Sequence, residues 1–242
     1  MLRLTKRVSK GLRKLKTDIM RKVVARLYLA GEGIEIGGLH NPLPVPRKAS
    51  VRYVDRMSVD DLRIQYPELK REKLVHVDII DNGELLETIE DETQCFVIAN
   101  HFLEHSQNPL LAAQNMLRVL KLGGVLYVAL PDKRYTFDAA RPVTTLAHVI
   151  DDFNHGPAGS RFSHFEEWVH FVNGVTGDSE IAEKATALME QDYSIHFHVW
   201  TQKEMLEFFL YISHSICFDF EIILKNGDEV ILVLRKSEQA AK

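Results

Sequence analysis

Short apolar runs alternate with segments of helical periodicity over the first 131 residues. The runs are four to six residues long and rich in Val, Ile and Leu, which is typical of strands buried on both faces. We expect strands at residues 34–37, 51–54, 74–77, 95–99 and 125–130. Strands that alternate with helices at this spacing predict a parallel sheet built from right-handed crossovers.

Two of the expected helices have recognisable ends. Ser58 and Asp61 resemble a capping box at the start of a helix that stops before Pro67. A second helix is expected at residues 108–122, where Asn and Pro begin the helix and the glycine pair 123–124 ends it. Both helices therefore fall between expected strands, as a crossover connection requires.

The last third of the chain has a different pattern. Residues 132–200 are aromatic, rich in His and weakly periodic, so we expect an insertion that folds over the strand ends like a lid. Residues 201–204 form another capping-box sequence and predict a helix. Residues 218–224 and 229–234, joined through Asn226-Gly227, predict a hairpin. Together the elements predict an α/β fold with a doubly wound, seven-stranded sheet, mostly parallel and ending in an antiparallel C-terminal hairpin.

The net charge of −4 hides an asymmetry between the N-terminal segment and the rest of the chain. Residues 1–26 contain ten Lys or Arg residues and one Asp, which leaves a net charge of −13 on the remainder. Apolar residues recur in this segment at steps of three and four, and predict one face of an amphipathic helix. This apolar stripe consists of Val8, Leu12, Leu15, Ile19, Val23 and Leu27.

Residues 1–30 therefore form a basic helix beside a domain of residues 31–242, and two roles for it remain open. It packs its stripe on the domain as a lid or a homodimer element, which we favour, or it lies on an anionic membrane surface or a partner enzyme. A cleaved targeting peptide is disfavoured because the helix runs almost directly into the first strand. A nucleic acid partner is disfavoured because a body charged at −13 repels phosphate.

The sequence favours a cytoplasmic protein. No apolar run approaches the length of a membrane span, and no cleavable signal peptide is visible. Cys95 and Cys217 lie far apart and lack metal-ligand spacing, which is typical of a reducing compartment. The cytoplasm, including its membrane surface, is therefore the expected location.

A glycine turn follows the first expected strand. The segment Ile34-Glu-Ile-Gly-Gly-Leu-His-Asn-Pro42 ends this apolar strand, and Asp55 ends the next one. This arrangement is how a doubly wound sheet holds a ribose-bearing cofactor. A nicotinamide-dependent oxidoreductase is disfavoured because no Gly-x-Gly-x-x-Gly follows the strand.

Several segments, taken together, resemble one known family. They are Ile34-Glu-Ile-Gly-Gly38, Asp55, Val77-Asp78, Phe96-Val-Ile-Ala-Asn-His-Phe-Leu-Glu-His105 and Arg118-Val-Leu-Lys-Leu-Gly-Gly-Val-Leu-Tyr-Val-Ala-Leu-Pro131. These segments look like the class I S-adenosylmethionine-dependent methyltransferases, over about residues 32–131. The resemblance implies a Rossmann-like fold and S-adenosyl-L-methionine as cofactor. Residues 131–148 also resemble a bacterial subgroup that is associated with glycan assembly.

The resemblance implies that the glycine turn surrounds the methionine portion of the cofactor. Glu35 would lie beneath the turn and orient the ammonium group directly or through a water, with Gly37, Gly38 and Asn41 forming the turn. The family has glycines where this chain has Leu39 and Asn41. Asn tolerates the left-handed conformation and Gly38 adds freedom, so a tight turn remains possible.

The other residues expected to bind the cofactor lie at the ends of three further strands. They are Asp55, Arg56, Asp78, Ile79, Asn100 and His101. Asp55 would accept both ribose hydroxyls, unless it pairs with Arg52 or Arg56. Asp78 and Ile79 would meet the adenine, with Asp81 competing for this role, and backbone carbonyls near Asn100 would hold the amine.

Methyl transfer requires alignment of the acceptor, exclusion of water and, for a hydroxyl acceptor, a base. His101 and His105 are the bases nearest to the expected methyl position, and Asp132, just past the fifth strand, is a third candidate. Each of the two histidines has an equally plausible structural role.

The acidic and histidine residues of the insertion have three readings. They are His148, Asp151, Asp152, His155, His164, His196 and His198. They could line a polar substrate pocket, hold a divalent cation, or be scattered structural and surface residues. We favour the pocket and predict no metal, because no tight ligand spacing is present.

These observations predict an enzyme that O-methylates a small polar acceptor, such as a sugar or a glycan intermediate. N- or C-methylation of a small metabolite is an alternative within catalysis. The alternative from another class is a non-catalytic, cofactor-binding scaffold that uses its basic helix to bind a membrane or a partner.

Overall fold

The strands form one seven-stranded sheet with the order β3-β2-β1-β4-β5-β7-β6. The computed structural model describes the backbone of residues 2–238 and the side chains of residues 15–238. The strands are β1 (Gly31–Ile36), β2 (Ala49–Asp55), β3 (Ile79–Ile80), β4 (Gln94–Asn100), β5 (Leu120–Pro131), β6 (Phe218–Asn226) and β7 (Glu229–Lys236). Strands β1 to β5 pair in parallel, whereas β7 is antiparallel to both β5 and β6. The predicted Rossmann-like sheet with a C-terminal hairpin is confirmed.

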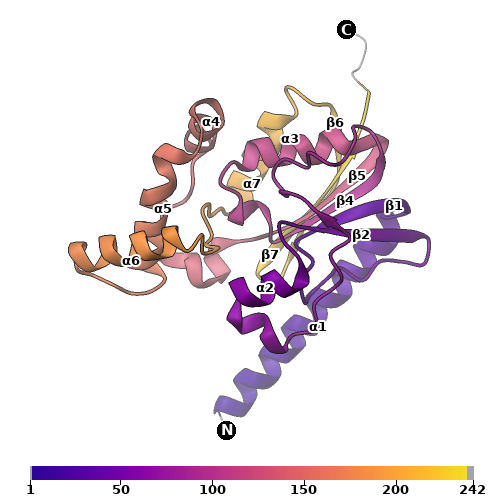
Figure 1. The fold of residues 1–242 in the computed structure, drawn as a ribbon. Coiled ribbons are helices and arrows are strands. Elements are labelled where there is room, and N and C mark those ends of the chain that lie inside the picture. The colour runs from indigo at the N-terminus through magenta and orange to yellow at the C-terminus, as the bar shows by residue number, and fades with distance from the viewer. Residues whose placement is uncertain (1, 239–242) are drawn as a thin grey trace.

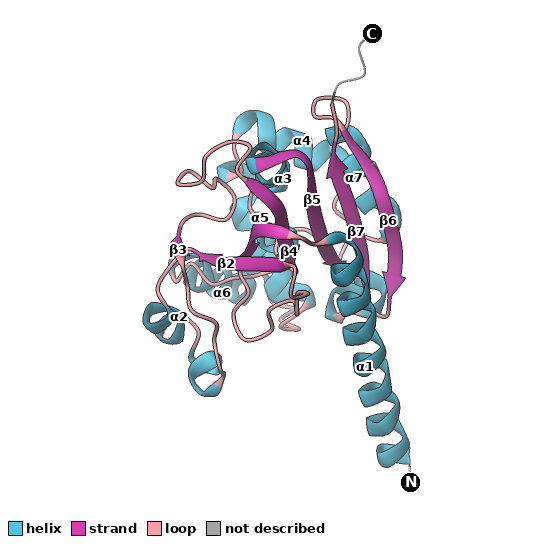
Figure 2. Cartoon of the chain, turned by 90° about the vertical axis from the view of Figure 1, so that its right-hand side faces the viewer, coloured by secondary structure: helices cyan, strands magenta, loops and turns pink. Residues whose placement is uncertain are grey.

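Helices cover both faces of the sheet (Figures 1 and 2). Helices α3 (Pro109–Val119) and α7 (Gln202–Ile212) pack with inward-facing strand residues into the larger core. Helix α1 (Leu2–Tyr28) covers the opposite face, where Val24 and Ala25 join a second cluster with Phe96 and Tyr127. None of the helices in residues 2–238 combines the length and apolar character needed to span a membrane.

Helix α1 packs on the sheet with a face other than the predicted one. Leu15, Ile19, Val23 and Leu27 are between 44% and 65% exposed, so the apolar stripe points away from the domain. The buried face instead includes Val24 and Ala25, and Arg21 from the same side reaches β7. A polar side chain lies inward because a buried carboxylate on β7 provides its partner. Val8 and Leu12 lie outside the residues whose side chains are described.

Two predicted boundaries are wrong. The third strand is not at residues 74–77: only Ile79–Ile80 pairs with β2, because the peptide of Val75 donates to Leu39 in the glycine turn instead. The helix expected at 108–122 ends at Val119, and Gly123 and Gly124 lie inside β5. Gly123 has a φ of 75°, and a Cβ on Gly124 would lie 2.7 Å from the Lys121 carbonyl, so the pair shapes an irregular strand start rather than a helix end.

The insertion consists mainly of helices α4 (Leu146–His155), α5 (Ala158–Phe171) and α6 (Asp178–Glu190). Figure 1 shows them gathered on one side of the sheet. Helices α5 and α6 pack around a small core of their own, to which Phe165 and Phe197 contribute. A polar tie joins this lobe to the region after β2: Arg56 pairs with Asp192, which follows α6, and also donates to Tyr66. Tyr66 lies just beyond α2 (Val59–Gln65).

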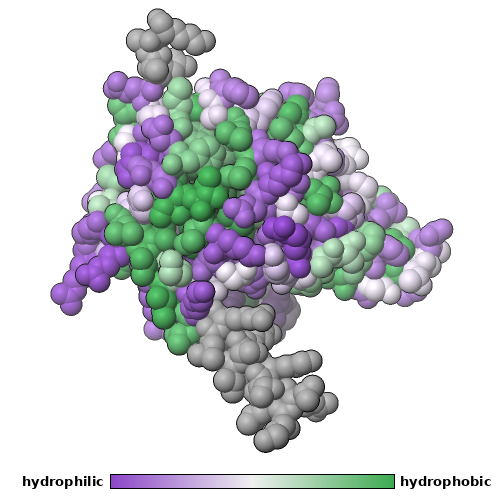
Figure 3. Space-filling view, turned by 180° about the vertical axis from the view of Figure 1, so that it is seen from behind, coloured by the Kyte–Doolittle hydropathy of each residue, from purple (hydrophilic) through white to green (hydrophobic). Residues whose placement is uncertain are grey.

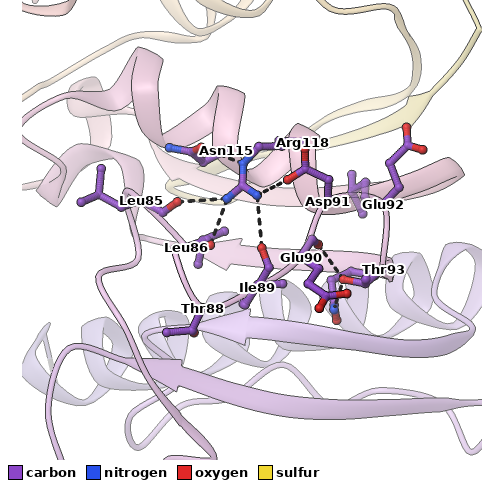
Figure 4. A network of polar contacts seen from close by, with 12 residues as sticks. Leu85, Leu86, Thr88, Ile89, Glu90, Asp91, Glu92, Thr93, Asn115 and Arg118 are labelled. Atoms are coloured by element: carbon purple, nitrogen blue, oxygen red, sulfur yellow. Dashed lines mark hydrogen bonds and ion pairs between the residues drawn. The ribbon is translucent and has the colours of Figure 1, made fainter.

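The loop between β3 and β4 is held by Arg118 of α3 (Figure 4). Its guanidinium donates to the carbonyls of Leu85, Leu86 and Ile89 at 2.9–3.2 Å and pairs with Asp91. One side chain thus satisfies three loop carbonyls that have no strand partner. Arg118, at the C-terminal end of α3, thus fixes the part of the loop that leads into the start of β4.

Candidate active site

The glycine turn after β1 adopts a left-handed conformation at two positions. Gly37 has a φ of 65° and Leu39 a φ of 43°, and the Asn41 peptide donates to the Gly38 carbonyl at 3.0 Å. Leu39, at a family glycine position, thus takes the strained conformation itself, while Asn41 does not. A Cβ on Gly38 would lie 2.9 Å from the ring of Tyr53, so the turn also needs close contact with β2. The tight turn forms without the family's full glycine pattern.

Glu35 lies beneath this turn and is almost fully buried. Its two carboxylate oxygens accept the peptide N–H of Leu43 at 2.9 and 3.1 Å. Burial raises the pKa of Glu35 to about 8, although the Leu43 peptide and the charge of Arg21 oppose the shift. The carboxyl group therefore ties the exit of the turn to the end of β1.

At the end of β2, Asp55 is half-buried and accepts the Arg56 peptide N–H at 2.8 Å. Burial raises the pKa of Asp55 to about 6, against the opposing effects of the Arg56 peptide and side chain. The Arg56 guanidinium is directed toward Asp192 and Tyr66 rather than into an ion pair with Asp55. The Asp55 carboxylate therefore keeps exposed surface that a ligand can contact.

The two acidic residues expected near the adenine make protein contacts. Asp78 is exposed and accepts the Tyr53 peptide N–H at 2.8 Å. Asp81 is buried and accepts from both the peptide and the hydroxyl of Thr88. Ile79, in β3, is half-buried and packs against the larger core. Asp55 and Asp78 therefore each keep part of the carboxylate open to a ligand, whereas Asp81 does not.

Asn100 lies at the end of β4, and the state of its side-chain amide bears on cofactor binding. Both polar atoms of its side-chain amide are buried and make no hydrogen bond of good geometry with the described residues, although the amide lies close enough to Glu35 to lower the pKa of that carboxyl group. Buried amides are normally paired, so one without a hydrogen bond of good geometry at the carboxyl edge of a doubly wound sheet points to a polar ligand. Asn100, Asp55 and the turn at Gly37 are a donor and acceptor set that fits S-adenosyl-L-methionine.

His101 follows β4 with a φ of 51°, a conformation rare outside glycine. Its Nε2 lies 2.9 Å from Glu229 and its Nδ1 3.4 Å from Glu104. Burial lowers the pKa of His101, but the two carboxylates outweigh this effect and raise it overall. Because both ring nitrogens face carboxylates, the imidazole is suited to holding Glu104 and Glu229 in place.

Next to it, Glu104, His105 and His196 bring one ligand-type atom each to within 4.8 Å of one another. His105 Nδ1 donates to the Ile195 carbonyl at 2.9 Å, and His196 Nδ1 to Asp138 at 2.8 Å, so each Nε2 atom is an acceptor when its ring is neutral. Both Glu104 oxygens are buried without a hydrogen-bond partner. This set of acceptors can take a proton from a hydroxyl group or hold a divalent cation.

Burial shifts the protonation of this cluster. Burial, with the nearby charge of His196, lowers the pKa of His105 to about 3, so its ring is neutral at pH 7. Burial also raises the pKa of Glu104, against the opposing charges of His101 and His196. A carboxylate with a raised pKa can accept a proton near neutral pH, whereas an imidazole with a pKa of about 3 stays neutral and can only accept a hydrogen bond.

Aromatic side chains of the insertion border the cluster. The ring of Phe137 lies 4.9 Å from that of His196 and 5.6 Å from that of Trp168, measured between centroids. Phe137 is 58% exposed, whereas Arg141, which pairs with Asp138, is fully buried. Phe137 and Trp168 thus form an aromatic rim beside the buried polar side chains of the cluster.

Asp132, predicted as a third candidate base, is not part of this cluster. Its carboxylate is buried and accepts two hydrogen bonds from the Arg134 guanidinium, at 2.9 and 2.6 Å. These bonds outweigh burial and lower the pKa of Asp132. The structure therefore brings His101 and His105 together with Glu104, and leaves Asp132 in an ion pair.

The sequence pattern indicated no role for Glu104 or Asp138. Glu104 lies inside the Leu103-Glu-His105 motif, and the motif itself was the available signal. Asp138 lies in a short 3-10 helix, where only its contacts with His196 and Arg141 place it beside the cluster. His196 was singled out, but its partners come from segments about 60 and 90 residues earlier in the chain.

Comparisons with known proteins bear on the fold. No protein-family model matches the chain, and no curated protein sequence matches it. A proposed Zn-dependent alcohol dehydrogenase from Rhodobacter sphaeroides has a similar structure, with a TM-score of 0.51 and 12% identity, covering 92% of this chain and 90% of that one.

Two methyltransferase structures have similar scores. The CurJ carbon methyltransferase has a TM-score of 0.49 and 11% identity; the match covers 93% of this chain, which spans only 55% of that structure. A proposed S-adenosyl-L-methionine-dependent methyltransferase from Methanococcus maripaludis has a TM-score of 0.48 and 12% identity, covering 99% and 94%. Of the three similarities, the one with a TM-score above 0.5 describes the Rossmann-like fold alone.

Proposed function

We propose that this protein is an S-adenosylmethionine-dependent methyltransferase that acts on a hydroxyl group of a small polar acceptor, such as a sugar or a glycan intermediate. The observation that carries the proposal is the buried amide of Asn100, which makes no hydrogen bond of good geometry with the described residues and lies at the same sheet edge as the half-buried carboxylate of Asp55. A protein without a ligand at this edge would leave a buried amide unsatisfied at a cost of about 1–3 kcal/mol.

The cofactor is held by residues of three strand ends. Asp55 accepts the ribose hydroxyls, the Asn100 amide pairs with polar groups of the methionine portion, and the turn from Gly37 to Asn41 encloses that portion. Glu35 keeps the turn closed through its bonds to Leu43. When bound, the cofactor supplies an activated methyl group, so the protein needs only to align the acceptor and remove its proton.

Glu104 is the proposed base. Its carboxylate has no hydrogen-bond partner among the described side chains, its pKa is raised by burial, and His101 lies 3.4 Å away to stabilise its charged form. His105 stays neutral beside it and accepts a hydrogen bond from the acceptor. Glu104 itself is only 1% exposed, so little water competes for the base.

The acceptor is proposed to lie between this cluster and the aromatic rim. Phe137 and Trp168 provide faces on which a sugar ring can stack, and His196 offers an acceptor atom for a hydroxyl. An N- or C-methylated metabolite remains the alternative. The site suits N- or C-methylation less well, because a buried carboxylate is the kind of base that a hydroxyl nucleophile needs.

The test uses calorimetry with S-adenosylmethionine and with its demethylated product. We expect both to bind to the parent protein and both to bind more weakly to Asn100→Ala. Labelled cofactor and a panel of sugars and glycan intermediates, followed by mass spectrometry, then identify the acceptor. If neither S-adenosylmethionine nor its demethylated product binds, the enzyme proposal is wrong. If they bind but no acceptor is methylated, a cofactor-binding scaffold is favoured.

We also infer a membrane-surface role for α1. Leu15, Ile19, Val23 and Leu27 are exposed on one face of the helix, and its sequence carries ten basic residues within positions 1–26. Figure 3 shows apolar surface on the side of the molecule that carries α1. An apolar stripe flanked by basic residues fits an anionic lipid surface better than an acidic protein body.

A further inference from the structure

A second polar cluster lies in the insertion, apart from the proposed base. His148 and Asp152 are one turn apart on α4, His164 is on α5, and His198 is on the segment that returns to the sheet. One ring nitrogen from each of the three histidines lies within 4.8 Å of the others. Residues up to 50 positions apart are thus brought to one point.

Two distances within the cluster are close to those between the ligands of a metal ion. The Nε2 atoms of His148 and His164 are 3.0 Å apart, and Asp152 Oδ2 is 3.2 Å from His148 Nε2. Ligand atoms of a tetrahedral zinc ion, at about 2.0–2.1 Å from the metal, lie roughly 3.3 Å from one another. The three histidine nitrogens lie within 4.8 Å of one another, whereas Asp152 Oδ2 is close to His148 alone, so the ligand set is three histidines.

The N–H protons of the histidines cannot give every ring nitrogen and carboxylate oxygen of this cluster a hydrogen-bond partner. One N–H on His148 can donate to His164 or to Asp152, but not fully to both. His198 is fully buried, and its Nδ1 has no partner among the described residues. Asp152 Oδ2, on a residue only 3% exposed, likewise receives no hydrogen bond. Two buried acceptors without donors point to a missing cation.

The surrounding contacts orient the ligands toward this point. Ser160 donates to Asp152 Oδ1 at 2.6 Å, which leaves Oδ2 directed at His148. His198 Nε2 lies 3.4 Å from the Gln107 carbonyl, which places its proton there and its lone pair on Nδ1. Metal-binding side chains in proteins are oriented by outer hydrogen bonds of this kind.

We propose that His148, His164 and His198 form a zinc site that fastens helices α4 and α5 of the insertion to the segment leading back into the sheet, with Asp152 beside His148 to balance the charge of the ion. The three histidines come from three separate segments, so an ion bound to them ties these segments together. It holds the lobe that carries Trp168 over the candidate active site, so its loss loosens the acceptor side while the sheet stays folded.

Metal analysis of the full-length protein, purified without a metal-affinity tag, tests the proposal. We expect about one zinc ion per chain, and removal by a strong chelator should lower the melting temperature, with recovery on adding zinc. Cobalt substitution should give the intense visible absorption of a tetrahedral site. Absence of bound zinc together with an unchanged melting temperature on adding zinc would overturn the proposal.

Single variants locate the ion. His164→Ala and the milder His198→Gln should each lose zinc and its effect on melting temperature, whereas His155→Ala, an exposed histidine of α4, should keep both. If a variant fails to fold, loss of cobalt absorption from the parent on chelation still tests the site. Zinc that is lost in His196→Ala but kept in His164→Ala and His198→Gln would assign it to the Glu104 cluster and refute this proposal.

Discussion

Arg21 of α1 and Glu229 of β7 form a two-pronged ion pair, in which Arg21 Nε lies 2.8 Å from Glu229 Oε1. Glu229 is 1% exposed and also lies 2.9 Å from His101 Nε2. Burial raises the pKa of Glu229, but its bonds to Arg21 and His101 outweigh this and lower it to about 2. The N-terminal helix is thereby linked, through one carboxylate, to the candidate active site.

Replacing Arg21 by Met should destabilise the protein by roughly 3–5 kcal/mol, because a buried carboxylate then loses its main counter-charge. Urea unfolding measures the difference, with the exposed Arg26→Met as the control. The pair stabilises the fold above the unfolded pKa of Glu229, near 4.5, and this contribution is lost as the pH falls toward about 2. Equal unfolding midpoints for the two variants would show that the pair adds nothing.

Glu35→Gln should change how stability depends on pH. The folded pKa of about 8 exceeds the unfolded value of 4.5, so the carboxyl contributes stability below pH 4.5 that is lost as the pH rises to about 8. The parent should lose about 1.4 kcal/mol per pH unit between these values relative to the Gln variant. Unfolding measured from pH 5 to 8 checks this, and parallel curves for the two proteins would contradict it.

Asp55→Asn should weaken binding of S-adenosylmethionine by about 1–3 kcal/mol, because charge-assisted hydrogen bonds to the ribose are lost. In the parent, affinity should fall as the pH drops through about 6, where Asp55 takes up a proton. Calorimetry over pH 5 to 8 measures both effects. Asp60→Asn, at an exposed position of α2, serves as the control and should leave affinity unchanged. If the affinity of the parent protein for S-adenosylmethionine does not change between pH 5 and 8, Asp55 is not part of the cofactor site.

Glu104→Gln should lower kcat by roughly 10²- to 10⁴-fold, the usual contribution of a general base, with cofactor affinity largely intact. His105→Ala should also lower turnover, through lost positioning of the acceptor. Asp132→Asn tests the third base predicted from sequence, and its ion pair with Arg134 predicts little loss of kcat. Turnover that depends on Asp132 and not on Glu104 would reverse the assignment.

Ile19→Asp with Val23→Asp should abolish binding to vesicles that contain phosphatidylserine, because both side chains belong to the exposed stripe of α1. Binding of the parent should weaken with added salt and be absent on neutral vesicles. Ile64→Asp, at an exposed position of α2, is the control. A parent that does not sediment with anionic vesicles, but forms dimers that the double substitution disrupts, would favour the homodimer role.

The sequence by itself determined most of the sheet. Strands β1, β2, β4 and β5, the helix begun by Thr201 and the hairpin at Gly227 follow from local features, namely apolar runs, a capping box and a left-handed glycine. These signals act within a few residues, so they can be read along the chain. The turn after β1 could be predicted too, although the strain at Leu39 could not.

Only the tertiary structure decided which face of α1 is buried and which polar groups meet. The periodicity of α1 identifies an apolar stripe, but the buried Glu229 on β7 turns Arg21 inward and leaves that stripe outside. His196 meets Glu104, and His198 meets His148, across 50 to 92 residues of intervening chain. Such contacts depend on how the insertion packs on the sheet. The spacing of these residues along the sequence does not show which of them meet in space.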